Sequence, residues 1–196
     1  MGKRQEAAIL TRKKVIIAAD KLIAERGFEN VTISDIAAEA GVAVGTFYTY
    51  FKRKEDVVGE IAHSNFTAME RRSIESNDGI IEKLTYFLTE SMIYIAETGL
   101  KVAQQWFRNA VDSNEDGRGK LDYDRRVVGD ILRQGIVTGE LKGDIPVDKL
   151  SFWIVSEYYG ICMLWCMLDG AVDPTEKLKE FCQTRLKPML SDYINQ

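Results

Sequence analysis

The feature that most limits how this chain can fold is the stretch Thr32–Lys54, in which two short amphipathic segments meet at Gly41. In the first segment, apolar residues such as Ile36 recur at the spacing of one helix face. Thr32 followed by Asp35 is a weak capping box, which marks where this helix begins. Glycine readily adopts a positive φ, so Gly41 ends the first helix and turns the chain. Two short helices joined by such a turn predict a helix-turn-helix.

The second of these segments has an unusual outer face. At about 100° per residue, Phe47 and Phe51 point together toward the interior. Thr46 and Thr49 point outward, and Tyr48 lies on the flank. Small residues, hydroxyls and tyrosines, followed by three basic residues, suit a helix that enters the major groove of DNA. We therefore expect this second helix to contact base edges.

The residues of this region occur in a specific order. They read Gly27-Phe28, then Thr32-x-x-x-Ile36-Ala37, then Gly41-Val42-x-x-Gly45-x-Phe47-Tyr48-x-Tyr50-Phe51-x-x-Lys54-Glu55. Over residues 15–58 this order resembles the DNA-binding signature of TetR-family regulators. The sequence departs from the family pattern at Ala43, where Ser is usual, at Tyr50, where His is usual, and at Arg53, where a small polar residue is common. The resemblance implies a dimeric transcriptional regulator.

The resemblance, carried over position by position, implies two sets of DNA contacts. One set would donate to phosphates and fix the register; it comprises Thr32, Tyr48, Tyr50 and Lys54. The other set would face base edges; it comprises Val44, Gly45, Thr46 and Thr49. Ala43 belongs to the same surface, but without the hydroxyl of the usual Ser it offers no side-chain cap. The alternative for the two tyrosines is packing against neighbouring helices.

The charge of the chain is unevenly distributed. Residues 1–54 carry 10 Lys and Arg against 6 Asp and Glu, whereas the remainder carries 16 against 24. A basic first quarter on an acidic body indicates one module for a polyanion and a second module for something else. We therefore expect a DNA-binding domain over residues 1–54 and a helical ligand-binding and dimerisation domain over residues 55–196.

The rest of the sequence predicts further helices and an all-α fold. Few prolines and few alternating apolar runs argue against strands. We expect the first dozen residues to be frayed and residues 112–120 to form a loop. About nine helices result, with the longer ones expected at Thr11–Arg26, Lys54–Ser76, Ile80–Thr98, Leu100–Val111, Leu121–Val137, Val147–Leu168 and from Pro174 onward.

The penultimate predicted helix is apolar on nearly all sides and must be covered on more than one of them. Its most apolar part, Phe152–Leu168, is short and interrupted by Ser156 and Glu157, so we expect a buried helix and no membrane span. A homodimer through the last two helices, forming a four-helix bundle, would bury the excess. An odd number of cysteines and the absence of a hydrophobic leader favour the cytoplasm.

Aromatic side chains crowd the second module, and they either fill its core or line a ligand cavity. Glu157 would either bind a ligand or pair with an Arg at the dimer seam. Zinc is not expected, because Cys162, Cys166 and Cys182 match no zinc spacing; no cofactor is expected, and a redox role for the first two stays open. The expected effector-binding residues are His63, Phe66, Phe87, Met92, Trp106, Tyr123, Glu157, Tyr158 and Ile161.

Three functions follow from these features. The leading hypothesis is a repressor that is released from a palindromic double-stranded DNA operator by a small, mainly apolar or aromatic effector. The second is a constitutive DNA-binding protein without an effector. The third is an all-helical enzyme, against which the single His and the lack of a nucleophile–base motif argue.

Overall fold

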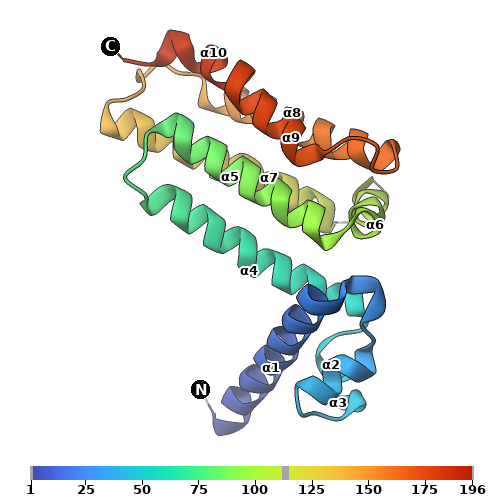
Figure 1. Ribbon diagram of the computed structural model, residues 1–196. Coiled ribbons are helices and arrows are strands. Elements are labelled where there is room, and N and C mark those ends of the chain that lie inside the picture. The colour runs from blue at the N-terminus through green and yellow to red at the C-terminus, as the bar shows by residue number, and fades with distance from the viewer. Residues whose placement is uncertain (1, 112–114, 196) are drawn as a thin grey trace. The chain divides into compact units, whose positions relative to one another are not determined.

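The computed structural model describes residues 2–111 and 115–195, and these residues are predominantly α-helical (Figure 1). The prediction of an all-α fold is therefore confirmed. The chain forms two compact units, which divide between Thr67 and Ala68. This division falls inside one continuous helix, α4 (Lys54–Glu75), so the helix belongs to both units.

The first unit contains α1 (Lys3–Arg26), a 3₁₀ turn (Phe28–Asn30), α2 (Ile33–Glu39), α3 (Val44–Tyr50) and the first part of α4. Its core comprises apolar side chains from all four helices, among them Val15, Leu22, Ile36, Phe47, Phe51, Val57 and Ile61. The prediction of a frayed start was wrong, because α1 already begins at Lys3. Residues 3–10 are almost all strong helix formers, and this local propensity extends the helix although none of residues 5–10 is buried.

Local interactions fix the turn between α2 and α3. The backbone N–H of Asp35 donates to Thr32 Oγ1 at 3.1 Å, and the N–H of Thr32 donates to Asp35 Oδ2 at 2.9 Å, which completes the capping box. The Thr32 hydroxyl also donates to the Asp35 carboxylate, and this bond, followed by that from the Thr32 N–H, lowers the pKa of Asp35. Gly41 has a φ of 67°, the left-handed value that a glycine-terminated helix requires.

The second unit contains α5 (Ile80–Thr98), α6 (Leu100–Val111), α7 (Glu115–Thr138), α8 (Val147–Met167) and a last helical run. That run comprises α9 (Pro174–Phe181), a π-helical turn (Cys182–Leu186), α10 (Lys187–Leu190) and a 3₁₀ turn (Ser191–Tyr193). If the run is taken as one helix, the described residues contain nine, in agreement with the expected number.

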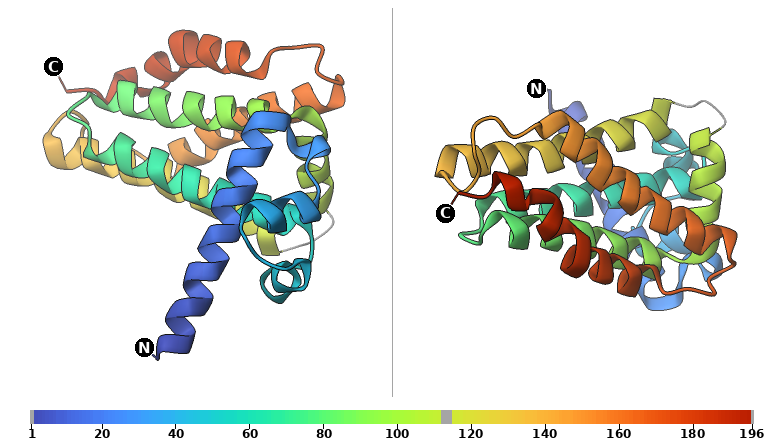
Figure 2. Two further views of the ribbon diagram at one scale, coloured as in Figure 1. Left: turned by 60° about the horizontal axis from the view of Figure 1, so that its bottom comes forward. Right: turned by 90° about the horizontal axis from the view of Figure 1, so that it is seen from above.

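Four helices of the second unit pack in a closed ring, α5 on α7, α7 on α8, α8 on α9 and α9 on α5 (Figure 2). α6 packs against α5, α7 and α8. The apolar side chains inside this ring form one continuous core, and its fully buried members include Leu84, Met92, Ile131, Leu132, Ile154, Leu178 and Leu186.

The predicted loop at residues 112–120 differs from the structure. Residues 112–114 lie outside the described residues, but residues 115–120 already form the start of α7, six residues before the predicted start at Leu121. The two glycines in this stretch suggested a loop. An ion pair between Lys120 and Asp124, four residues apart on α7, is a helix-stabilising contact that composition alone does not indicate.

Candidate functional site

The outer face of α3 is bare in the first unit. Val44 and Tyr48 are 40% and 55% exposed, and Gly45 and Thr49 are exposed with them. Thr46 is half-buried at the edge of this face. The inner face is fully used, because Phe47 and Phe51 lie in the core. The helix therefore presents small, methyl and hydroxyl groups to solvent, as the sequence predicts.

The two tyrosines of α3 lie differently. Tyr48 packs the edge of its ring against Phe47, with 5.6 Å between ring centroids, and leaves the rest of the side chain in solvent. Tyr50 is half-buried and packs against the core of the first unit. The packing alternative thus describes Tyr50 better than Tyr48.

Lys54 has a structural position that the sequence did not indicate. Its Nζ donates to the carbonyl oxygens of Phe28 and Val31 at 2.6 and 2.7 Å, and it lies 3.9 Å from the centroid of the Phe28 ring. It therefore ties the start of α4 to the segment before α2. Thr32 is similarly engaged, since its hydroxyl donates to Asp35 Oδ2 at 2.6 Å.

The turn between α3 and α4 contains Lys52, a basic residue that was not among the predicted DNA contacts. The backbone N–H groups of Lys52 and Arg53 each donate to Asp56 Oδ2 at 2.9 Å, which holds the turn. The Lys52 side chain is exposed, whereas Arg53 pairs with Asp56 at 3.3 Å. Asp56 four residues after Lys52 is a capping signal that was available in the sequence.

Gly45 is not required by the packing of the first unit. A Cβ built on Gly45 would meet no described heavy atom within 4 Å, and the same holds for Gly59 on α4. Both residues are helical and exposed. A glycine inside a helix is destabilising relative to alanine. Because neither packing nor helix stability favours glycine at position 45, its presence there is not explained by the fold of the first unit.

The predicted effector-binding residues belong to both units. His63 and Phe66 belong to the first unit, where His63 is exposed and Phe66 buried. In the second unit, the structure buries Phe87, Met92 and Tyr158 and half-buries Trp106, Tyr123 and Ile161.

Glu157 lies on the exposed face of α8. Two roles were expected for it, contact with a ligand or pairing with an Arg at a dimer seam, and an exposed position suits the seam. The helix was expected to be covered on more than one side, and within the second unit α8 keeps one side open.

The second unit encloses a polar cluster formed by Lys120, Asp124 and Tyr159. Asp124 is 2% exposed, and Lys120 Nζ donates to its two carboxylate oxygens at 2.5 and 2.6 Å. The Tyr159 hydroxyl donates to Asp124 Oδ2 at 3.0 Å. Burial raises the pKa of Asp124 and lowers that of Lys120, because burial disfavours both charged forms, and their mutual attraction opposes these shifts.

Tyr158, next to this cluster, is 4% exposed. Its hydroxyl is buried and has no hydrogen-bond partner within the part of the chain that the structure describes. Burial raises the pKa of Tyr158 well above its usual value, and the Asp124 carboxylate adds to the rise. The phenol therefore keeps its proton and remains a hydrogen-bond donor.

A second polar network joins α7 to α4 within the second unit. The Tyr123 hydroxyl donates to Glu70 Oε2 at 2.8 Å, and the two terminal nitrogens of Arg126 reach the two carboxylate oxygens of Glu70 at 2.8 and 3.2 Å. Tyr123 is adjacent in sequence to Asp124, so this network and the polar cluster occupy the same turn of α7.

The outer face of α8 is an apolar stripe. Trp153 and Met167 are 52% and 70% exposed, and Phe152, Leu164 and Leu168 are exposed with them. Ser156, Glu157 and Gly160 lie between these side chains on the same face. Of the helices in the described ranges, α8 is the one long and apolar enough to cross a membrane, by length and composition. Its other face lies in the core of the second unit.

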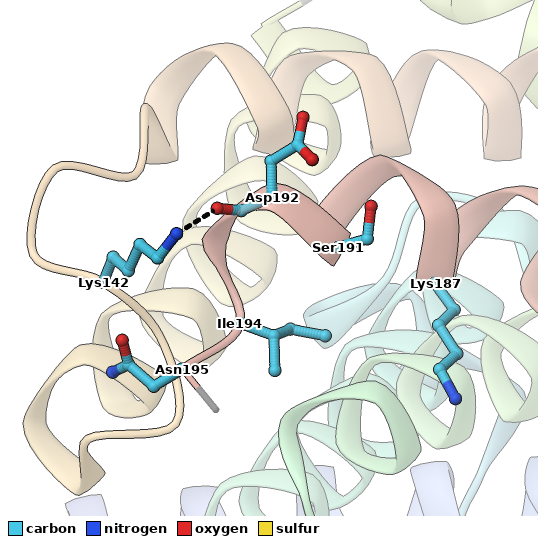
Figure 3. A pocket seen from close by; sticks show the side chains of 6 residues that line it. All are labelled: Lys142, Lys187, Ser191, Asp192, Ile194 and Asn195. Atoms are coloured by element: carbon cyan, nitrogen blue, oxygen red, sulfur yellow. Dashed lines mark hydrogen bonds between the residues drawn. The ribbon is translucent and has the colours of Figure 1, made fainter.

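Two further features bear on the expected sites. All three cysteines are free and buried, and burial raises the pKa of Cys162 to about 12. A surface hollow lies where the C-terminal end of the chain meets the turn after α7, and none of the predicted effector-binding residues lines it (Figure 3). Its lining consists of Lys142, Lys187, Ser191, Asp192, Ile194 and Asn195.

The chain is similar to known transcriptional regulators. A family model described as "Bacterial regulatory proteins, tetR family" matches residues 15–61. The fatty acid metabolism regulator protein of Bacillus subtilis is 29% identical over 170 residues, 82% of this chain and 86% of that protein. The transcriptional repressor KstR2 of Mycobacterium tuberculosis is 28% identical over 168 residues, 76% and 80% of the two chains.

A solved structure resembles the fold along most of its length. FadR from Bacillus subtilis in complex with stearoyl-CoA superposes with a TM-score of 0.58 at 27% identity, covering 88% of this chain and 97% of that one. The sequence and structure matches therefore extend through both units, well beyond residues 15–61.

Proposed function

Because the chain belongs to the TetR family of bacterial transcriptional regulators, we propose that it is a dimeric repressor which binds an operator and is released by a small effector. The prediction of a regulator and not an enzyme is confirmed by the relatives. The observation that carries the proposal is the bare outer face of α3, within the residues that match the family model.

The proposed DNA contacts follow from the exposure of α3. Val44, Gly45, Thr46 and Thr49 face base edges, with methyl groups against thymine methyls and hydroxyls that hydrogen-bond to either base. Tyr48 and Lys52 reach phosphates, whereas Lys54, Thr32 and Tyr50 hold the unit together. Ala43 places the N-terminus of α3 near the backbone of the duplex. The first 54 residues act as the DNA-binding domain.

The proposed dimer covers the α8 stripe with the same stripe of a second copy. An exposed row containing two aromatic side chains, two leucines and a methionine is typical of an interface and costly in water. The last helical run packs against α8, and its exposed side, which is polar, forms the rim of the proposed interface. Glu157 then lies at the seam, where a cation of the second copy pairs with it.

The proposed effector binds in the second unit, and residues 55–196 form the effector-binding and dimerisation domain. Since a relative with 27% identity binds stearoyl-CoA, long-chain acyl-CoA thioesters are the first compounds to test. Effector binding that moves α7 acts on α4 through Glu70, to which Tyr123 and Arg126 are bonded. α4 continues into the first unit, so the movement reaches the DNA-binding residues. Such coupling is reciprocal: operator DNA weakens effector binding by the same factor.

The proposed site of action is the bacterial cytoplasm, where the DNA lies, with no membrane attachment. The core contacts of α8 account for one side of its apolar surface, and the second copy accounts for the other.

The decisive experiment is selection of bound sequences from random double-stranded DNA at moderate salt, with wild-type protein and the Gly45→Ala variant in parallel. We expect the wild type to enrich an inverted repeat and the variant to enrich it far less. Failure of the wild type to enrich any sequence would overturn the proposal. If acyl-CoA and every other effector tested leave binding to the enriched sequence unchanged, the constitutive alternative holds.

A further inference from the structure

We propose that the Tyr158 hydroxyl is the anchor for an uncharged hydrogen-bond acceptor, a ketone, ester or thioester carbonyl, carried on an apolar part of the effector. This inference rests on the proposed function, in which the second unit binds the effector. It assigns a chemical class to the group that the effector must present.

The Tyr158 hydroxyl is buried and unpaired among the described residues. Buried polar groups in folded proteins are almost always hydrogen-bonded, because an unpaired one has lost its water without compensation. Tyr158 is an exception within the described residues: its side chain is 4% exposed and its hydroxyl has no partner there. The neighbouring Tyr159 has the ordinary arrangement, since its hydroxyl donates to Asp124 at 3.0 Å. Two adjacent tyrosines of α8 thus differ in whether their hydroxyl is occupied.

The charges beside Tyr158 are already balanced. Tyr158 lies close enough to the buried Asp124 carboxylate for the two to interact electrostatically, and the Lys120 ammonium bonds to both oxygens of Asp124. A carboxylate or phosphate brought to Tyr158 would lose its water without gaining a counter-ion from this pair. An uncharged acceptor avoids that cost and accepts a hydrogen bond from the phenol.

Aromatic rings surround the neighbour of Tyr158. The ring centroids of Trp106 and Phe107 lie 6.0 and 6.2 Å from that of Tyr159, and the Tyr159 centroid lies 5.6 Å from that of Tyr158. The Tyr158 hydroxyl is therefore part of an aromatic cluster, and aromatic side chains with a few polar groups are a usual lining of small-molecule sites. Asp124 beside Tyr158 is followed back along α7 by Tyr123, which bonds to Glu70.

The first test uses the protein without any ligand and compares Tyr158→Phe with Tyr159→Phe. Removing an unpaired buried hydroxyl relieves its desolvation, so Tyr158→Phe should raise Tm by about 2–4 °C. Tyr159→Phe breaks a hydrogen bond to a buried carboxylate and should lower Tm. A fall in Tm for Tyr158→Phe would show that its hydroxyl already has a partner in solution and would overturn the proposal.

The second test measures binding of three probes of similar shape by the change in tryptophan fluorescence: 4-phenyl-2-butanone, butylbenzene and 4-phenylbutanoate. The ketone should bind the wild type about tenfold more tightly than it binds Tyr158→Phe, the loss of one hydrogen bond. Butylbenzene should bind both proteins equally, and the carboxylate should bind the wild type more weakly than the ketone. Equal binding of the ketone to both proteins, no binding of the ketone, or tighter binding of the carboxylate would each overturn the proposal.

A third measurement separates this inference from the proposed function. Tyr158→Phe should keep wild-type affinity for the selected DNA when no ligand is present, because Tyr158 lies in the second unit. If the ketone binds through Tyr158 but leaves DNA binding unchanged, the anchor proposal holds and the proposal that this site controls DNA binding is wrong. If the wild type binds no DNA sequence, the regulator function fails, whereas the two tests above still decide on the anchor.

Discussion

The outer faces of α3 and α8 are both exposed, and each carries a glycine with open space around it. The face of α3 is formed by small and hydroxyl-bearing side chains with Tyr48 at its edge. The face of α8 is formed by large apolar side chains, Phe152, Trp153, Leu164 and Met167 among them. The two helices therefore leave very different surfaces without a partner.

This difference separates the two proposed partners. The hydroxyl and methyl groups that surround Gly45 on α3 suit the edges of bases, where contacts are short and partly hydrogen-bonded. A wide apolar row suits a second apolar row, because removing both surfaces from water is favourable in free energy. Inner faces alone do not show this contrast, since Phe47 on α3 and Ile154 on α8 are both fully buried. The exposed face of each helix, and not its buried face, therefore indicates the chemistry of the partner that binds there.

The largest effect should come from placing a charge on the α8 stripe. Leu164→Glu should convert the dimer to a monomer, because a carboxylate would be buried without a partner at the seam. Affinity for the inverted repeat should then fall by a factor of about 100 or more, since the second half-site no longer binds as part of one complex. Sedimentation and fluorescence anisotropy measure the two effects. Val137→Glu is the control, since Val137 is 85% exposed on α7 and lies off the stripe; a monomeric control or a dimeric Leu164→Glu would contradict the assignment.

The next effect concerns the glycine of α3. Gly45→Ala adds a methyl group to the face that approaches the bases, and we expect operator affinity to fall about 10- to 100-fold, the range expected when the helix can no longer reach one or two bases. The fold should be unaffected or slightly stabilised, because the added Cβ meets no described atom and alanine favours the helix. Gly59→Ala on α4 makes the same change in the same kind of space and should leave affinity unchanged. Equal losses in both variants would mean that the open space at Gly45 has no special role.

A smaller effect should separate two lysines that are two residues apart. Lys52→Ala should reduce the slope of log affinity against log salt concentration by about 0.9 for each phosphate that the protein no longer neutralises, with stability nearly unchanged. Lys54→Ala should instead lower the free energy of unfolding by about 1–3 kcal/mol, because two carbonyl oxygens lose their donor. Salt titrations and chemical denaturation distinguish them. The assignment is wrong if the salt slope responds to Lys54 and not to Lys52.

The stability of the second unit, which contains Cys162, should depend on pH in alkaline solution. The pKa of Cys162 is raised from 9.0 to about 12 by burial, so the folded protein holds the thiol proton after the unfolded chain has released it. This contribution to stability is fully present below pH 9 and is lost as the pH rises toward 12. Cys162→Ala should therefore flatten the fall of stability with pH in that range. An unchanged slope would show that this thiol does not contribute to it.

The smallest effect is expected at the N-terminus of α3. Ala43 is the N-cap residue, and its side chain accepts no hydrogen bond. Ala43→Ser supplies an oxygen for the backbone N–H groups of the first turn and should stabilise the first unit by about 0.5–2 kcal/mol. Thermal denaturation measures the gain. Ala38→Ser, at an exposed position inside α2, should give no gain; a similar rise in both variants would rule out capping as the cause.

The sequence predicted most of the fold because its signals were local. Thr32 with Asp35 and the glycine at position 41 are short-range signals, and the structure places the capping box and the positive φ at these residues. The start of α1 was missed because residues 5–10 carry no buried stripe that would mark a helix, and the start of α7 was missed because its glycines suggested a loop. Helix starts are weakly marked when no capping residue precedes them.

The candidate sites were harder to predict because they depend on long-range contacts. Lys54 bonds to carbonyl oxygens 26 and 23 residues earlier in the chain. The sequence does not reveal bonds over such a separation, so Lys54 was predicted to contact a phosphate. The sequence left two roles open for Glu157, a ligand contact or a pair at a dimer seam, and only the packing of α8 shows that its face is open. The pairing of Asp124 with Tyr159, 35 residues apart, has no signal in either segment. Such contacts exist only after the helices have packed.

The account depends most on two copies of α3 reaching one duplex, joined through α8. The most direct measurement is the mass of the complex with the selected DNA by native mass spectrometry, together with the spacing of the selected half-sites. We expect two chains per duplex, on half-sites whose centres lie about 10–10.5 base pairs, or a multiple of that, apart. One chain per duplex at full affinity, on a single half-site, would contradict the account.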